Sequence, residues 1–309
     1  MANESIFQDV AAVEAWDTWF RWRENGRLRD RTIEATWERV ARALAGAGRT
    51  GHQVDYMAAC AAWRLLPDER VLATAGTELP SWTADGLVAV VNAAQFVRDA
   101  RTPRACFDAA EFAATAELAV FLLDDAAAAA PRGVESSRLR IGVIGVADAL
   151  DALDQDYGTP EACVRAGEIG FALAEGCLRG SARLAAERGP GETFKDEQWR
   201  RACERGMSPG VVDEVRRYGV RYTQLTAVTP QPRLARLANN VTDAIDAPRR
   251  PFPPLVPGNP VSGGPGIATA RDSRSWAYAR MQVAMREALQ PWIDEPIAYP
   301  LVMPFEQPR

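Results

Sequence analysis

Apolar residues recur at helical spacing along much of the first two-thirds of the chain, and this periodicity restricts the fold to a mainly helical one. Between residues 33 and 44 they fall at i, i+4, i+7, i+8 and i+11, which places them on one helix face: Ile33, Trp37, Val40, Ala41 and Leu44. Thr32 is a suitable N-cap for this helix, and Gly46 marks its expected end. Similar spacing predicts helices over residues 10–24, 54–66 and 276–289.

Two longer helices are predicted from their start signals. Asp108 with Glu111 three residues later forms a capping-box pattern, so a helix should begin there. Thr159 followed by Pro160 combines an N-cap with proline at the first helical position. The second of these helices should run to about Gly189.

Strand signals are few, and one segment is rich in proline and glycine. Residues 139–146 suit a short buried strand or turn that leads into a helix, and residues 222–228 suit another strand. Residues 247–266 hold seven prolines and four glycines, so they are predicted to be a linker or an irregular surface crossing. The expected fold is therefore mainly α with a small partial β-sheet.

Five tryptophans in the first helices could be taken for an aromatic ligand box: Trp16, Trp19, Trp22, Trp37 and Trp63. Their helical spacing favours the other interpretation, that they pack in the core.

Composition excludes several kinds of site. His52 is the only histidine, so a multi-histidine metal site is excluded and no metal is expected. The five cysteines are far apart, with no Cys-x-x-Cys, which is typical of the free thiols of a cytoplasmic protein.

A net charge of −5 argues against nucleic-acid binding. No apolar run reaches the ~20 residues of a membrane span, and Met1–Asp9 lacks a signal pattern.

One region departs from this acidic balance. Residues 200–250 contain ten arginines and five acids. Arginine forks there could hold a phosphate-bearing ligand, and the candidate phosphate or nucleotide contacts are Arg221, Arg233 and Arg236. The other interpretation is a solvated helix face with spare arginines.

Six stretches of the chain, taken in order, match the segments of one known family. The most specific is residues 138–189, which begins RLRIGVIGVADAL and ends SARLAAERG. The others are residues 32–45 (TIEATWERVARALA), 66–77 (LPDERVLATAGT), 91–125 (VNAAQFVRDARTP to FLLDD), 225–246 (LTAVTPQPRLARLANNVTDAID) and 290–304 (QPWIDEPIAYPLVMP). Together these stretches resemble the large chain of the class II, adenosylcobalamin-dependent ribonucleotide reductases.

The resemblance implies a remnant of the second half of the reductase α/β barrel, preceded by N-terminal helices. It divides the chain into four parts. These are an N-terminal helical region (1–80), a partial barrel core (81–246), a Pro/Gly-rich linker (247–272), and a C-terminal helix with a closing segment (273–309).

The chain differs from this family at the segments that hold the family's catalytic cysteines and phosphate-binding residues. Between Thr77 and Val91 the family has several hundred residues, including the finger loop with the thiyl-radical cysteine, whereas this chain has thirteen. The family's next reductive cysteine falls at Gly86. The Thr-Gly-Thr of its phosphate-binding turn falls at residues 231–233, where Pro232 removes an N–H donor. The polar residues of its closing strand fall at residues 298–302, which read Ala-Tyr-Pro-Leu-Val.

These departures predict a ribonucleotide-reductase-like protein without catalytic residues, acting as a binding, scaffold or regulatory subunit. One alternative is an active cobalamin- or nucleotide-linked radical enzyme, or one part of a split ribonucleotide reductase. Another is a nucleotide-sensing module that uses the arginines of residues 200–250. Adenosylcobalamin and nucleotides are implied as ligands by the resemblance only. Because a partial barrel leaves open strand edges, we expect a protein partner or self-association.

Overall fold

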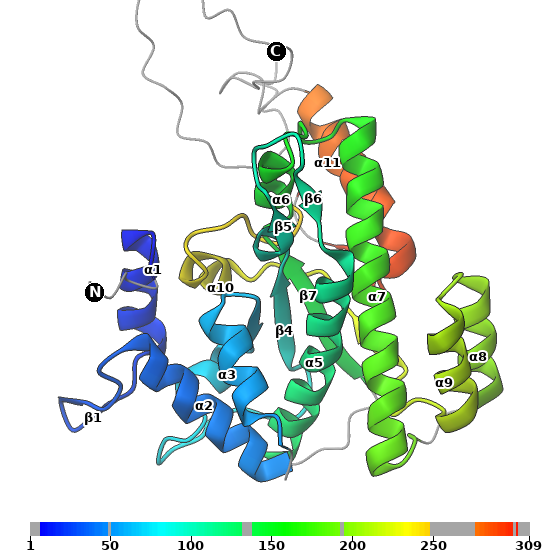
Figure 1. Cartoon of the computed structure of the whole chain (residues 1–309). Coiled ribbons are helices and arrows are strands. Elements are labelled where there is room, and N and C mark those ends of the chain that lie inside the picture. Colours follow the sequence, from blue (N-terminus) through cyan, green and yellow to red (C-terminus); the bar gives the residue numbers. More distant parts are fainter. Residues whose placement is uncertain are drawn as a thin grey trace, which may run out of the picture.

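A small sheet surrounded by helices forms the centre of the protein, as Figure 1 shows. The structure is a computed structural model, and it describes residues 7–48, 51–131, 138–191, 195–247, 276–298 and 301. Helix predominates over strand in the described residues, so the expected mainly α fold with a small β-sheet is confirmed. None of the helices in these ranges is long and apolar enough to cross a membrane.

The central sheet has four strands in the order β3-β4-β7-β8. β4 pairs in parallel with β7, and β7 with β8, whereas β3 is antiparallel to β4. β3 and β8 are the edge strands, so the described sheet is open. The strands are β3 (Leu65–Pro67), β4 (Val88–Asn92), β7 (Arg138–Ile144) and β8 (Gln224–Thr226).

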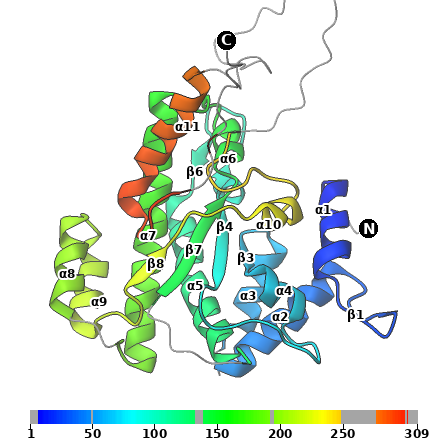
Figure 2. The ribbon, with the colours of Figure 1, turned by 180° about the vertical axis from the view of Figure 1, so that it is seen from behind.

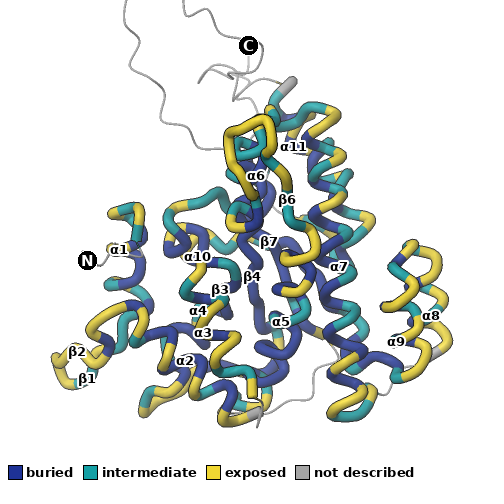
Figure 3. Tube along the Cα trace, viewed as in Figure 1, coloured by how far each residue is buried: buried dark blue, intermediate teal, exposed yellow. Residues whose placement is uncertain are grey.

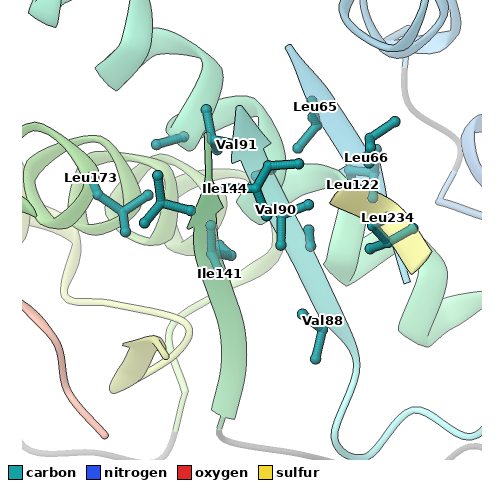
Figure 4. Packing of buried hydrophobic residues seen from close by; sticks show 14 of the residues in the cluster. Leu65, Leu66, Val88, Val90, Val91, Leu122, Ile141, Ile144, Leu173 and Leu234 are labelled. Carbon is teal, nitrogen blue, oxygen red and sulfur yellow. The ribbon is translucent and has the colours of Figure 1, made fainter. Parts of the chain in front are cut away.

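The core lies where the sheet meets two long helices, α5 (Ala109–Ala128) and α7 (Pro160–Arg188). Both helices lie on the same face of the sheet in the two opposite views (Figures 1 and 2). All five residues of β4 are buried, as expected for a parallel strand covered on both faces, and the burial map shows this centre in dark blue (Figure 3). Figure 4 shows side chains from β3, β4, β7, α5, α7 and α10 (Pro232–Leu237) meeting there.

The predicted start signals of three helices are confirmed. Thr32 accepts a hydrogen bond from the Ala35 N–H at 3.4 Å at the start of α2 (Ile33–Gly48). The carboxylate of Asp108 accepts from the Glu111 N–H at 3.2 Å, and the hydroxyl of Thr159 accepts from the Ala162 N–H at 3.2 Å. α7 ends at Arg188 with Gly189 as its C-cap, which agrees with the predicted end near Gly189.

Two predicted helices are shorter than expected. The helix predicted over residues 10–24 consists of α1 (Val10–Ala15) and a π-helical turn η1 (Trp16–Phe20), followed by a hairpin. Asn25 and Gly26 both have positive φ, the conformation that a tight hairpin turn requires. The helix predicted over residues 54–66 ends at Ala61, because the apolar run from Leu65 pairs with β4. Local periodicity does not distinguish a short buried strand from a helix end.

The C-terminal segment covers the outer edge of β8. The carboxylate of Asp294 accepts hydrogen bonds from the N–H groups of Leu225 at 2.8 Å and Thr226 at 3.1 Å, and the Glu295 N–H donates to the Thr226 carbonyl at 3.2 Å. These contacts satisfy backbone groups that an edge strand would otherwise expose. The expected strand over residues 222–228 is confirmed only for its central three residues.

The remaining elements connect or flank this centre. Residues 248–272 of the expected linker lie outside the described residues, and the four predicted regions stay predictions. The elements are β1 (Arg23–Glu24), β2 (Arg27–Leu28), α3 (Gln53–Ala61), α4 (Glu69–Thr74), η2 (Ala93–Phe96), β5 (Val97–Arg98), β6 (Cys106–Phe107), α6 (Val146–Ala152), α8 (Lys195–Glu204), α9 (Pro209–Tyr218), α11 (Trp276–Leu289) and η4 (Gln290–Trp292).

Glycines allow α5 and α7 to approach closely. A Cβ atom on Gly176 would overlap the carbonyl oxygen of Ala113, and one on Gly180 would lie 2.9 Å from the carbonyl oxygen of Glu117. Both neighbours are backbone atoms of α5, which a side-chain rotation cannot move. The separation of the two helices therefore depends on these glycines.

We expect Gly176→Ala to lower the free energy of unfolding by about 2 kcal/mol or more, because the added methyl group forces α5 and α7 apart. Gly46→Ala is the matched control, since this glycine also lies in a helix but has no atom within 4 Å of the added Cβ. It should raise the free energy of unfolding by about 0.5–1 kcal/mol. Urea unfolding of both variants measures the two effects, and equal effects would contradict the packing role of Gly176.

Candidate functional site

A cavity of about 790 Å³ lies beyond the carboxyl ends of β7 and β8. We call it the carboxyl-end cavity. Its walls come from α6, which follows β7, and from α10 and the chain after it, which follow β8. Parallel strands bring the segments that follow them to one edge of the sheet, where ligands of such sheets usually bind. The lining residues include Trp19, Arg101, Asp148, Asp151, Arg233, Arg236, Asn240, Thr242, Asp243 and Asp246.

Asp148 holds the inner wall of this cavity in place. Its carboxylate accepts hydrogen bonds from the Thr242 N–H at 2.7 Å and the Thr242 hydroxyl at 2.5 Å. The Gly145 N–H, at the end of β7, donates to the Thr242 carbonyl at 2.8 Å. After α10 the chain turns back through Asn239 and Asn240, which both have φ of +60°. These contacts tie the chain after α10 to the start of α6.

Two of the three predicted arginines, Arg233 and Arg236, line the carboxyl-end cavity from α10. Each also contacts a glutamate from the first part of the chain. The Arg233 guanidinium lies 3.3 Å from the Glu69 carboxylate, and that of Arg236 lies 3.1 Å from the Glu14 carboxylate. Burial raises the pKa of the Glu69 carboxyl, and Arg233 acts in the opposite direction.

Trp19 brings an aromatic ring to the carboxyl-end cavity, beside these arginines. The Arg233 guanidinium lies over this ring, 5.2 Å from its centroid, within the range of a cation–π interaction. The other tryptophans behave as expected: Trp16, Trp37 and Trp63 are buried in the core, and Trp22 is half-buried. Trp19 is half-buried, and the core prediction missed its place at the cavity because nothing local marks it.

Arg221, the third predicted arginine, lies at the other end of the sheet, before β8. Its Nε donates to the Asp124 carboxylate at 2.8 Å, and the Tyr222 hydroxyl donates to the same carboxylate at 2.6 Å. Arg188 contacts both Asp124 and the fully buried Asp125. Burial and the Asp124 charge raise the pKa of the Tyr222 hydroxyl. The structure thus separates Arg221 from the other two, and a ligand contact for any of the three stays a prediction.

This ionic cluster joins the ends of α5 and α7 to the start of β8. Sequence reasoning missed it, although one signal was present: two adjacent aspartates that interrupt the apolar run of α5. A carboxylate in such a run needs paired charges or hydrogen bonds when the helix is buried.

All five cysteines are free, and no cysteine lines the carboxyl-end cavity. Burial raises the pKa of the Cys60 thiol to about 12 and raises that of Cys177 well above its usual value. Cys163 is half-buried, and its sulfur lies 3.8 Å from the Met285 sulfur. Cys106 and Cys203 are exposed. In the described ranges we find no group of three or more His, Cys, Asp or Glu side chains that could hold a metal ion.

We expect a thiol reagent such as DTNB at pH 8 to label Cys106 and Cys203 rapidly in the folded protein, and Cys163 more slowly. Cys60 and Cys177 should react only after unfolding in urea, because burial blocks access and disfavours the thiolate. Mass spectrometry of the labelled peptides identifies the sites. Rapid labelling of Cys60 or Cys177 in the folded chain would contradict this assignment.

Comparison with known families supports the ribonucleotide reductase family in general, without assigning its class. A family model described as "Ribonucleotide reductase, barrel domain" matches residues 80–252, more than half of the chain. The match includes β4, β7, β8 and α10, and thus most of the wall of the carboxyl-end cavity, but not Trp19. No curated protein matches the chain. On the strength of the barrel-domain match, the chain belongs to the ribonucleotide reductase family.

Proposed function

We propose that this chain is a non-catalytic member of its family that binds a nucleotide in the carboxyl-end cavity and acts as a binding or regulatory subunit. The observation that carries the proposal is the lining of this cavity, which contains Arg233 and Arg236 but no cysteine. Guanidinium groups suit the recognition of phosphate, whereas ribonucleotide reduction depends on thiols.

The cysteines of this chain support the non-catalytic part of the proposal. A thiol must be accessible, and usually ionised, to act as nucleophile or reductant. Cys60 and Cys177 are buried with raised pKa values, and the exposed Cys106 and Cys203 are not among the cavity-lining residues. The resemblance further suggests that the finger-loop cysteine has no counterpart and that Gly86 replaces a reductive cysteine. Gly86 has φ of +68°, in the turn that leads to β4.

Adenosylcobalamin is the cofactor of the class II reductases that the sequence resembles. In that class the bound cofactor generates a radical on a protein thiol. The residues of the carboxyl-end cavity do not fit this role, since they offer no thiol to be oxidised. We therefore assign no cobalamin-dependent step to this chain.

The start of α10 supports a changed mode of phosphate binding. Pro232 lies at the first turn of this helix, where the family's turn has glycine, and it cannot donate an N–H to a phosphate. Arg233, the next residue, and Arg236 bring guanidinium groups to the same wall. The positive charge of these side chains would thus attract the phosphate in place of the backbone N–H groups of the family's turn.

We also propose that the chain has a protein partner or self-associates, and that it is cytoplasmic. The five free cysteines support the location, since disulfides are rare in the cytoplasm.

A second candidate function is one part of a split reductase. It is supported by the sheet, because β3 and β8 are edge strands that do not pair with each other in the described residues, although the segment around Asp294 covers the outer edge of β8. Co-expression with a chain that carries the family's finger-loop segment would then restore ribonucleotide reduction, which the non-catalytic proposal excludes.

Calorimetric titration with AMP and ADP tests the binding site. We expect Arg233→Gln with Arg236→Gln to weaken nucleotide binding at least tenfold. Arg221→Gln is the control, because it removes the same charge at the other end of the sheet. It should leave the affinity unchanged while lowering the free energy of unfolding, since it leaves Asp124 with one fewer partner. Unchanged affinity in the double variant would contradict the site.

The purified chain, supplied with adenosylcobalamin, a ribonucleotide and dithiothreitol, should form no deoxyribonucleotide. Detectable product would overturn the non-catalytic proposal.

A further inference from the structure

The wall of the carboxyl-end cavity that carries Trp19 comes from outside the barrel-domain match. Glu14 and Glu69, which contact the two cavity arginines, also precede residue 80, where that match begins. The first part of the chain thus adds an aromatic ring and two acids to a site whose other walls come from the barrel domain.

Acids outnumber cations around this cavity. Four aspartates and three arginines line it, and the two glutamates add to the acidic side. Arg101 lies 2.8 Å from Asp151, and Asp246 faces Arg286 at 3.9 Å, so two of the aspartates already have a basic neighbour. The Asp148 carboxylate is engaged by Thr242, and that of Asp243 accepts from the Gln231 N–H at 2.8 Å. Each cavity arginine thus has an acidic neighbour, and the surroundings are net acidic.

Several contacts hold the first part of the chain on α10 and the turn after it. The Gln8 N–H donates to the side-chain oxygen of Asn239 at 2.8 Å, and the Arg236 Nε donates to the Ala11 carbonyl at 3.4 Å. The π-helical turn η1 follows directly and carries Trp19 to the cavity. Turns of this rare type occur frequently at functional sites. Glu14 and Trp19 are therefore fixed relative to the arginines.

Trp19, Glu14 and Glu69 form what we call the N-terminal wall. We propose that this wall makes the cavity selective for a nucleoside monophosphate over the corresponding di- and triphosphates. Trp19 stacks on the base with the part of its ring that Arg233 does not cover, and Arg233 and Arg236 bind the single phosphate. Glu14 and Glu69 partly offset the charge of these two arginines, so too little positive charge is left to bind a second or third phosphate. Each further phosphate brings more negative charge into net acidic surroundings, where like charges repel. This inference rests on the proposed nucleotide site and specifies its ligand.

Calorimetry at low salt with AMP, ADP, ATP and ribose 5-phosphate tests the proposal. We expect the wild-type protein to bind AMP about tenfold more tightly than ADP, and ATP more weakly still. Glu14→Gln with Glu69→Gln should strengthen ADP binding about tenfold and AMP binding by less, which removes the preference. Glu161→Gln, at an exposed acid of α7, is the matched control and should change neither affinity.

The ring of Trp19 is tested separately. Trp19→Ala should weaken AMP binding about tenfold and leave ribose 5-phosphate unaffected, because the latter has no base to stack. Trp19→Phe keeps an aromatic ring and should retain most of the AMP affinity, which separates stacking from a folding defect.

The outcomes distinguish this inference from the proposed function. If AMP and ADP bind through Arg233 and Arg236, but the wild-type protein prefers ADP or the glutamate variants change nothing, the selectivity is wrong and the nucleotide site stands. If no nucleotide binds to any variant, both are wrong.

Discussion

The parallel pairing of β4 with β7 and of β7 with β8 is the constraint on which the rest of the molecule depends. It directs α6 and α10 to the same edge of the sheet, and the carboxyl-end cavity lies between these segments. The pairing in turn requires strands that are mostly buried, and helices that pack against them. Gly176 and Gly180 let α7 pack closely on α5, and both helices cover one face of the sheet (Figure 1); the segment around Asp294 covers the outer edge of β8.

The two ends of the parallel strands hold charge in different ways. At the amino end, Asp124 and Asp125 are buried and are engaged by Arg188, Arg221 and two tyrosine hydroxyls. Removing one partner from such a cluster leaves a buried charge without compensation. We therefore interpret this cluster as structural. At the carboxyl end, Arg233 and Arg236 are partly exposed and pair with partly exposed glutamates. Exposed pairs of this kind are weak, so an incoming anion can compete for these arginines.

Sequence reasoning predicted the elements whose signals are local. The caps at Thr32, Asp108 and Thr159 are correct because each depends on neighbours within a few residues. The strand at Leu65 was missed because its partner lies more than twenty residues away, and an apolar Leu-Leu pair fits either a helix or a strand. Arg221 and Arg233 are twelve residues apart, yet a strand between them carries the chain from one end of the sheet to the other. Trp19 reaches the cavity through tertiary packing alone, which the local pattern of a core tryptophan does not reveal.

Hydrogen exchange with and without AMP tests the central claim most directly, namely that this member of the reductase family retains a ligand site at the carboxyl ends of its strands. The account predicts that AMP slows amide exchange in residues 232–247 and in the turn around Trp19, with no change around Arg188 and Arg221. Slower exchange confined to the Arg188 and Arg221 end of the sheet, or no change anywhere at saturating AMP, would contradict it.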